Sequence, residues 1–158
     1  SFPTRRSSDL AKYEAAFAVI PLLVTFIPML TDTGGNAGSQ SSTMIIRGMA
    51  VGEIEAGDIL RVLWKELRVG IIVGILLGLV NYIQLLIRFP GQEMLCLTVV
   101  LSLLATVVIA KTIGCTLPII AQILHLDPAI MAAPLITTIV DAVSLVVYFQ
   151  LACSLLSI

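Results

Sequence analysis

The sequence predicts an all-α polytopic membrane helix bundle, with about four transmembrane helices and one short interfacial helix on the cytoplasmic side. Of its 158 residues, 58% are hydrophobic and only 12% are charged, about half the charged share of soluble domains. The mean hydropathy is +1.07, and four stretches reach the roughly 20 residues that a helix needs to cross a bilayer. This composition excludes a disordered chain, a nucleic-acid-binding domain and a soluble enzyme.

Residues 1–10, SFPTRRSSDL, differ from the rest of the chain because they are polar and basic. The string resembles the translation of a sequencing adapter, and we expect the natural sequence to begin near Ala11, with its own N-terminal part missing. Residues 11–158 then form a single transmembrane domain.

The four predicted spans follow from the apolar runs. The first covers residues 15–46 and turns from apolar to small and polar halfway along, and the second covers residues 69–87. The third covers residues 94–124 and is interrupted by Gly114 and Pro118. The last covers residues 129–158, with Pro134 near its start.

The stretch before the second span predicts a short interfacial helix over residues 58–68. Asp58 is a candidate N-cap, and four apolar residues recur on one face: Leu60, Leu63, Trp64 and Leu67. Charged residues occupy the remaining faces, which is typical of a helix that lies on the membrane surface.

Basic residues predict the orientation. Arg47 directly precedes the loop at residues 48–68, and Arg61, Lys65 and Arg68 lie within it. The next loop carries only Arg88. The positive-inside rule therefore places the first loop in the cytoplasm and the C-terminus outside a cytoplasmic membrane.

Polar residues inside the spans are candidate functional residues. Residues 31–40, TDTGGNAGSQ, combine glycines with a carboxylate and amides, and their helix is either unwound or tightly packed. Such oxygen donors suit hard cations, Mg²⁺, Ca²⁺ or Mn²⁺. We weigh Asp32 equally as a site residue and as a solvated acid.

Asp141 lies well inside the last span, where a carboxylate by default marks an ion or proton pathway. Thr137 and Ser144 share its helix face. The alternative is a protonated Asp141 that hydrogen-bonds to a neighbouring helix. Lys111, inside the third span, either snorkels to the surface or pairs with Asp127 or Glu66.

Two motifs together indicate a family. IPMLTDTGGNAGSQSSTMIIRGMAVGEI and LDPAIMAAPLITTIVDAVSLVVYF resemble the second and the last transmembrane helices of the MgtE family of magnesium transporters. The resemblance implies a homodimer with five transmembrane helices per chain. Residues 11–158 then correspond to helices two to five, without the first helix and the cytoplasmic N and CBS domains.

The resemblance also implies a magnesium site in a pore lined by the first and last spans of this chain. Asp141 matches the family aspartate that binds largely hydrated Mg²⁺, and the oxygens around Gly34, Gly35 and Asn36 complete that environment. Thr137 is a further contributor through its carbonyl. We expect additional pore-lining residues at Asp32, Gly38, Gln40 and Ser144.

Two other functions stay open. One is a gradient-coupled transporter of another divalent cation, Mn²⁺ or Co²⁺. The other is an intramembrane aspartyl protease with Asp32 and Asp141 as its dyad, although the Tyr-Asp and Gly-x-Gly-Asp motifs of such enzymes are not present.

Overall fold

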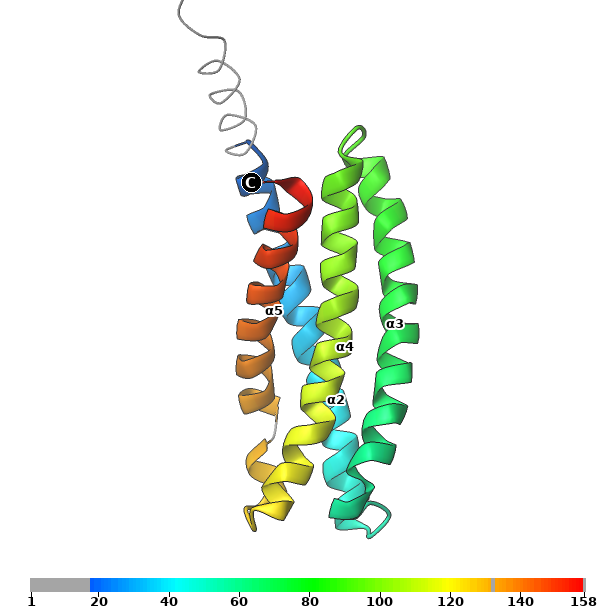
Figure 1. Cartoon of the computed structure of the whole chain (residues 1–158), viewed down its shortest axis with the longest axis vertical. Helices are drawn as coiled ribbons and strands as arrows, with labels where there is room; N and C mark the ends of the chain where they lie inside the picture. The colour runs from blue at the N-terminus through cyan, green and yellow to red at the C-terminus, as the bar shows by residue number, and fades with distance from the viewer. Residues whose placement is uncertain (1–17, 132, 158) are drawn as a thin grey trace, which may run out of the picture.

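The computed structural model describes residues 18–131 and 133–157 of the chain, so the predicted leader at residues 1–10 lies outside the described residues. Within the described part, the regular elements are all helical and form an up-and-down bundle (Figure 1). They are α2 (Ile27–Ala50), the short 3₁₀ helix η1 (Ala56–Asp58), α3 (Ile59–Arg88), α4 (Glu93–Ile123), the 3₁₀ helix η2 (Pro128–Met131) and α5 (Ala133–Leu156).

The bundle contains four helical segments that are long and apolar enough to cross a membrane, as the sequence predicted. They are Ala18–Ala50, Ala56–Arg88, Glu93–Ile123 and Ala133–Leu156. The first bends at Phe26, the N-cap of α2, two residues before Pro28 in the first turn of that helix. A proline there costs no helical hydrogen bond, because the first backbone N–H groups of a helix have no partner within it.

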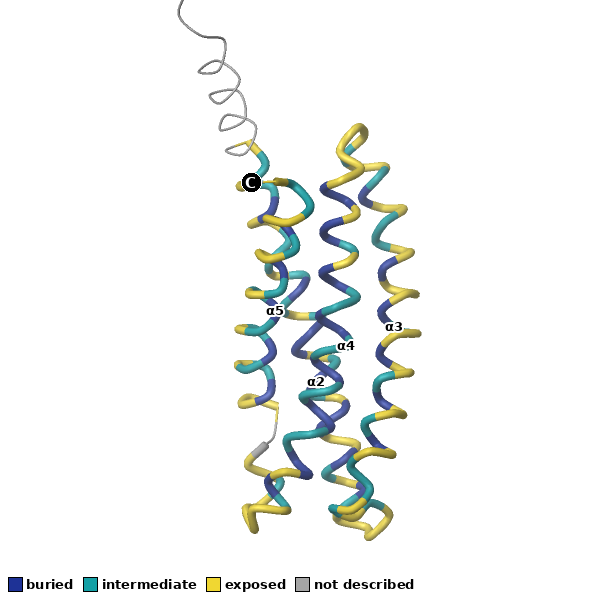
Figure 2. Tube along the Cα trace, in the orientation of Figure 1, coloured by how far each residue is buried: buried dark blue, intermediate teal, exposed yellow. Residues whose placement is uncertain are grey.

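Helix α4 is the centre of the bundle. It packs against α2, α3 and α5, whereas α2 and α3 do not pack directly along their length. Half of its most apolar window is buried, compared with 22% in each of the other three spans (Figure 2). The largest apolar cluster joins Leu95, Val99 and Leu103 of α4 to Leu30 of α2 and Tyr148 of α5.

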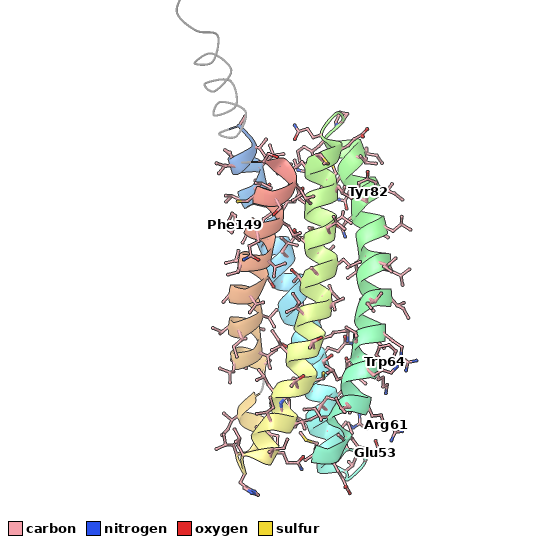
Figure 3. All side chains as sticks on the ribbon, in the orientation of Figure 1. Glu53, Arg61, Trp64, Tyr82 and Phe149 are labelled. Carbon is pink, nitrogen blue, oxygen red and sulfur yellow. The ribbon has the colours of Figure 1, made fainter. Side chains whose placement is uncertain are left out.

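Helix α3 attaches to α4 by a row of small residues. Gly70, Gly74 and Gly78 are buried, and a Cβ on Gly74 would lie 3.4 Å from the Cα of Leu104. The rest of its surface is rich in exposed Ile, Leu and Val, which suits contact with lipid tails. Trp64 also projects outward from α3 (Figure 3).

The prediction of a separate interfacial helix over residues 58–68 was wrong. Those residues form η1 and the first turns of α3, which continues without a break to Arg88. No glycine or proline stands between Ile59 and Val69, so no residue in this stretch terminates the helix.

The interruption predicted in the third span is also absent from the described helices, and of the two alternatives for the first span the tightly packed helix is the one observed. Helix α2 runs through Gly34 and Gly35, so its glycines serve tight packing rather than unwinding. Helix α4 runs through Gly114 and Pro118, both buried against neighbouring helices. Such residues are tolerated in transmembrane helices when neighbouring helices support them.

Candidate metal site between α2 and α5

Small residues bring α2 and α5 into close contact. A Cβ on Gly34 would lie 2.6 Å from Thr106 Cγ2 and 3.0 Å from Val140 Cγ1, so no side chain fits there. A Cβ on Gly35 would lie 3.2 Å from Thr137 Cγ2. The glycine pair therefore allows the backbone of α2 to lie directly against α5.

A pocket of about 350 Å³ lies beside this contact. Its walls are Pro28, Thr31, Asp32, Gly35 and Asn36 of α2 together with Thr137 and Asp141 of α5. Five residues predicted from the sequence thus come together although they lie about a hundred positions apart in the chain. The polar groups in this pocket are two carboxylates, one amide and two hydroxyls.

The two hydroxyl groups present oxygen lone pairs because their hydrogens are already used. Thr31 Oγ1 donates to the carbonyl oxygen of Ile27 at 3.0 Å, and Thr137 Oγ1 donates to that of Pro134 at 3.0 Å. Each threonine oxygen can still accept a hydrogen bond. A hydrated cation supplies the matching donors, since its water molecules point their hydrogens outward.

The pocket has too few charged ligands to hold a fully dehydrated ion by itself. No group of three or more His, Cys, Asp or Glu side chains lies together in the described part of the chain. Mg²⁺ requires six oxygen ligands in near-octahedral geometry and gives up its water reluctantly. Asp32 and Asp141 therefore fit a cation that keeps most of its water shell.

The remaining predicted site residues lie outside the lining of this pocket. Gly34 and Gly38 are buried at helix contacts, and Ser144 is buried beside Gly34. Gln40 is exposed on α2, one turn beyond Asn36. Their positions depend on how each helix is rotated relative to its neighbours, and a sequence motif carries no information about that rotation.

Two further residues line the pocket and were not predicted as site residues from the sequence, Pro28 and Thr31. Thr31 lies within the polar stretch at residues 31–40 and one helical turn before Gly35, so its spacing could have placed it on the same face. Pro28 could not be predicted as a site residue, because its side chain has no ligand atom and only forms part of the pocket wall.

A polar stripe continues from the pocket along the outer face of α2. Asp32, Asn36, Gln40, Thr43 and Arg47 are all exposed. At 100° and 1.5 Å per residue they fall within an arc of about 80° and extend over about 22 Å. Such a stripe is costly against lipid tails, so it requires water or another protein surface beside it.

Lys111 pairs with Glu66, one of the partners predicted for it. Lys111 Nζ lies 3.2 Å from Glu66 Oε2 and 3.2 Å from Ser41 Oγ, and Ser41 also donates a hydrogen bond to Glu66. Asp127, the other predicted partner, is exposed and accepts a hydrogen bond from the N–H of Ala129. The buried amine is thus satisfied within the bundle.

The chain is similar in sequence to known membrane transporters. Residues 27–151 match the profile of the family MgtE, described as divalent cation transporter. The chain is 34% identical to the magnesium transporter MgtE of Thermus thermophilus over 150 residues, which cover 95% of this chain and 33% of that protein. It is 35% identical to the Bacillus subtilis magnesium transporter MgtE over 145 residues, 92% of this chain and 32% of that protein. The chain therefore spans about a third of the length of these relatives.

Proposed function

The chain belongs to the MgtE family of divalent cation transporters, and from this premise we propose that it forms the ion path of a magnesium transporter in the cytoplasmic membrane. Members of this family are transporters and not enzymes, which excludes the aspartyl protease alternative. The observation that carries the proposal is the oxygen-lined pocket where Asp141 of α5 meets Asp32 and Asn36 of α2.

In this proposal Asp141 is the main site for hydrated Mg²⁺, which is the transported ion. Asp32, Asn36 and Thr137 accept hydrogen bonds from its water shell, and Gly35 leaves room for that shell. Contacts through water hold the ion without trapping it, as conduction requires. Gly34, Gly38 and Ser144 support this arrangement by holding α2 against α4 and α5.

We further propose that two copies of the chain form the path between them. The stripe from Asp32 to Arg47 is exposed on the outer face of α2. A second copy facing it would enclose a polar path and double the number of carboxylates near the ion. The same arrangement would keep Gln40 and Thr43 out of contact with lipid. Within this proposal, the end of the bundle at residues 48–68 is cytoplasmic and the C-terminus of α5 is outside.

The test is Mg²⁺ influx into liposomes that contain the full-length protein, because this chain covers only a third of its relatives. Asp141→Asn removes the charge with little change in volume, and Glu93→Gln, an exposed acid in the first turn of α4, is the matched control. We expect influx to fall at least tenfold in Asp141→Asn and to persist in Glu93→Gln, a factor that corresponds to about 1.4 kcal/mol. Unchanged influx in an assembled Asp141→Asn protein would remove Asp141 from the path.

The same liposomes separate a channel from an exchanger. Influx that follows the Mg²⁺ gradient alone supports a channel, whereas a requirement for a Na⁺ or proton gradient supports the gradient-coupled alternative. Competition with Mn²⁺ and Co²⁺ in the same assay tests which divalent cation is carried.

A further inference from the structure

A buried polar cluster joins three helices away from the metal pocket. Ser41 of α2, Glu66 of α3 and Lys111 of α4 form it, and their exposed fractions are 0%, 5% and 5%. Glu66 Oε2 accepts hydrogen bonds from both Ser41 and Lys111, and Lys111 also donates to Ser41 at 3.2 Å. We refer to these three residues as the Ser41 cluster.

The Ser41 cluster lies on the opposite side of α2 from the polar stripe. At 100° per residue, Ser41 points about 140° away from the middle of the stripe. Gly38, one turn earlier, lies on the same rear side and meets Gly114 of α4 so closely that a Cβ on Gly114 would overlap the Gly38 carbonyl oxygen. The rear of α2 is therefore held at two successive turns, first by backbone contact and then by hydrogen bonds.

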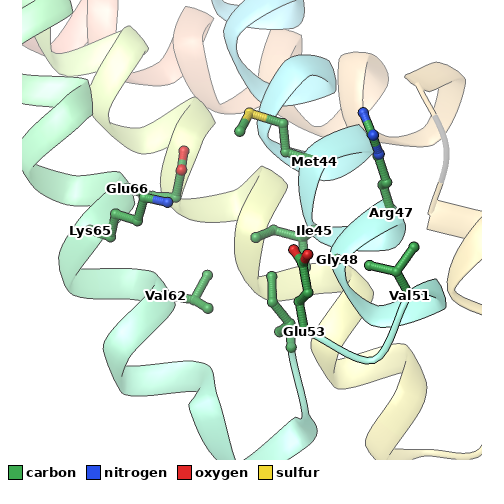
Figure 4. A pocket seen from close by; sticks show the side chains of 10 residues that line it. Met44, Ile45, Arg47, Gly48, Val51, Glu53, Val62, Lys65 and Glu66 are labelled. Carbon is green, nitrogen blue, oxygen red and sulfur yellow. The ribbon is translucent and has the colours of Figure 1, made fainter.

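Beyond the cluster, a cleft of about 380 Å³ lies between the last turns of α2 and the first turns of α3 (Figure 4). Met44, Ile45 and Arg47 line it from α2, and Val62 and Glu66 line it from α3. The buried side chains at this end are apolar and form a cluster of Ile45, Val62, Cys115 and Ile119. Apolar contacts have little directional preference, so they fix the rotation of a helix less sharply than hydrogen bonds do.

From this placement we infer that Glu66 and Lys111 are positioning residues for the ion path. By holding Ser41, they fix the rotation of the second half of α2 so that Gln40 and Thr43 continue the stripe begun by Asp32 and Asn36. This inference rests on the proposed function, since it assigns the role of a group that does not itself touch the ion.

The test reads the rotation of α2 directly and does not depend on transport. Single cysteines replace Gln40 or Asn36 in a full-length protein whose exposed Cys153 is changed to serine, and a water-soluble thiol reagent measures their labelling rates. We expect the labelling rate at position 40, relative to that at position 36, to fall several-fold when Ser41→Ala is added. Ser41→Ala is the cleanest variant, because it detaches α2 from the cluster and leaves the Glu66–Lys111 ion pair in place.

Ser39→Ala is the matched control. Its hydroxyl lies on α2 near Ser41, is buried and has no hydrogen-bond partner, so its removal should leave the labelling ratio unchanged. Glu66→Gln should change the ratio in the same direction as Ser41→Ala. An unchanged ratio in an assembled Ser41→Ala protein would overturn the positioning role while leaving the ion path intact.

The two proposals fail in different ways. Unchanged Mg²⁺ influx in the Asp141→Asn protein would rule out the proposed metal site, and it would leave the labelling ratios at positions 36 and 40 as expected. If positions 36 and 40 are both unreactive in the parent protein, the stripe is not in contact with water, and both the path and the positioning role are wrong.

Discussion

Gly35 of α2 and Asp141 of α5 face each other so closely that a Cβ on Gly35 would lie 3.8 Å from Asp141 Oδ1. The same atom would lie 3.2 Å from Thr137 Cγ2. A methyl group at position 35 would therefore lie in van der Waals contact with the carboxylate that we assign to Mg²⁺. This relationship makes the width of the pocket sensitive to a single methyl group.

Gly35→Ala should reduce Mg²⁺ influx and lower stability modestly. The added methyl group would lie 3.2 Å from Thr137 Cγ2, so that side chain must shift slightly. Overpacking of this kind costs about 1–3 kcal/mol in a well-packed site. Influx into liposomes and thermal unfolding in detergent measure the two effects. Gly57→Ala is the control, because a Cβ there meets nothing within 4 Å. Equal behaviour of the two variants would show that the pocket is wider than described.

Gly114→Ala should be more damaging to stability than Gly35→Ala. The new Cβ would collide with the backbone of Gly38, and a backbone carbonyl cannot rotate away as a side chain can. We expect a loss at the upper end of the roughly 1–3 kcal/mol range for overpacking, or beyond it. Thermal unfolding of the purified protein measures it, and a melting temperature equal to that of the parent would contradict the close contact of α2 and α4.

Lys111→Met should strongly destabilise the bundle, because it leaves the buried Glu66 carboxylate without its charged partner. Breaking a buried ion pair on one side costs about 3–5 kcal/mol. The double variant Glu66→Gln/Lys111→Met should recover much of that loss, since neither charge then remains. The melting temperatures of the parent, Glu66→Gln, Lys111→Met and the double variant form a double-mutant cycle. Simple additivity would show that the 3.2 Å contact between Glu66 and Lys111 contributes nothing.

Asp32→Asn should reduce Mg²⁺ influx by a smaller factor than Asp141→Asn. Asp32 is exposed on α2, whereas Asp141 is half-buried, so salt screens the field of Asp32 more effectively. Influx measured at about 0.01 M and about 1 M ionic strength tests this explanation, because the Debye length falls from about 30 Å to about 3 Å. An Asp32→Asn effect that does not shrink with added salt would place Asp32 in direct contact with the ion.

Tyr148→Phe should lower stability by about 1 kcal/mol. The buried Tyr148 hydroxyl donates to the carbonyl oxygen of Leu23 at 2.8 Å and so ties α5 to the segment before α2. Phenylalanine keeps the ring packing and removes only this hydrogen bond. Thermal unfolding should show the loss, with Mg²⁺ influx preserved, because Tyr148 lies two turns from Asp141. Lost influx at unchanged stability would give Tyr148 a role in transport instead.

The number of spans in the described residues and the choice of Asp141 as a candidate site residue followed from the sequence alone. The cost of moving a side chain from water into hydrocarbon depends on that side chain, so apolar runs and a carboxylate within one of them can be identified without a structure. The resemblance of the two motifs then placed five residues in one site: Gly34, Gly35, Asn36, Thr137 and Asp141. The pocket is lined by all of them except Gly34.

Tertiary contacts decided the rotation of α2, the continuity of α3 and the ion-pair partner of Lys111. The sequence could not show that Gly34 and Gly38 face α4 and α5 while Asp32 and Gln40 face outward. The sequence of a helix does not reveal which neighbouring helix each of its sides will contact. It left Lys111 with several partners, and it divided the continuous helix α3 in two. The local sequence determined which residues lie in apolar spans and which of them share a helix face. Packing around α4 decided which faces meet, because the direction in which a face points depends on the neighbouring helices.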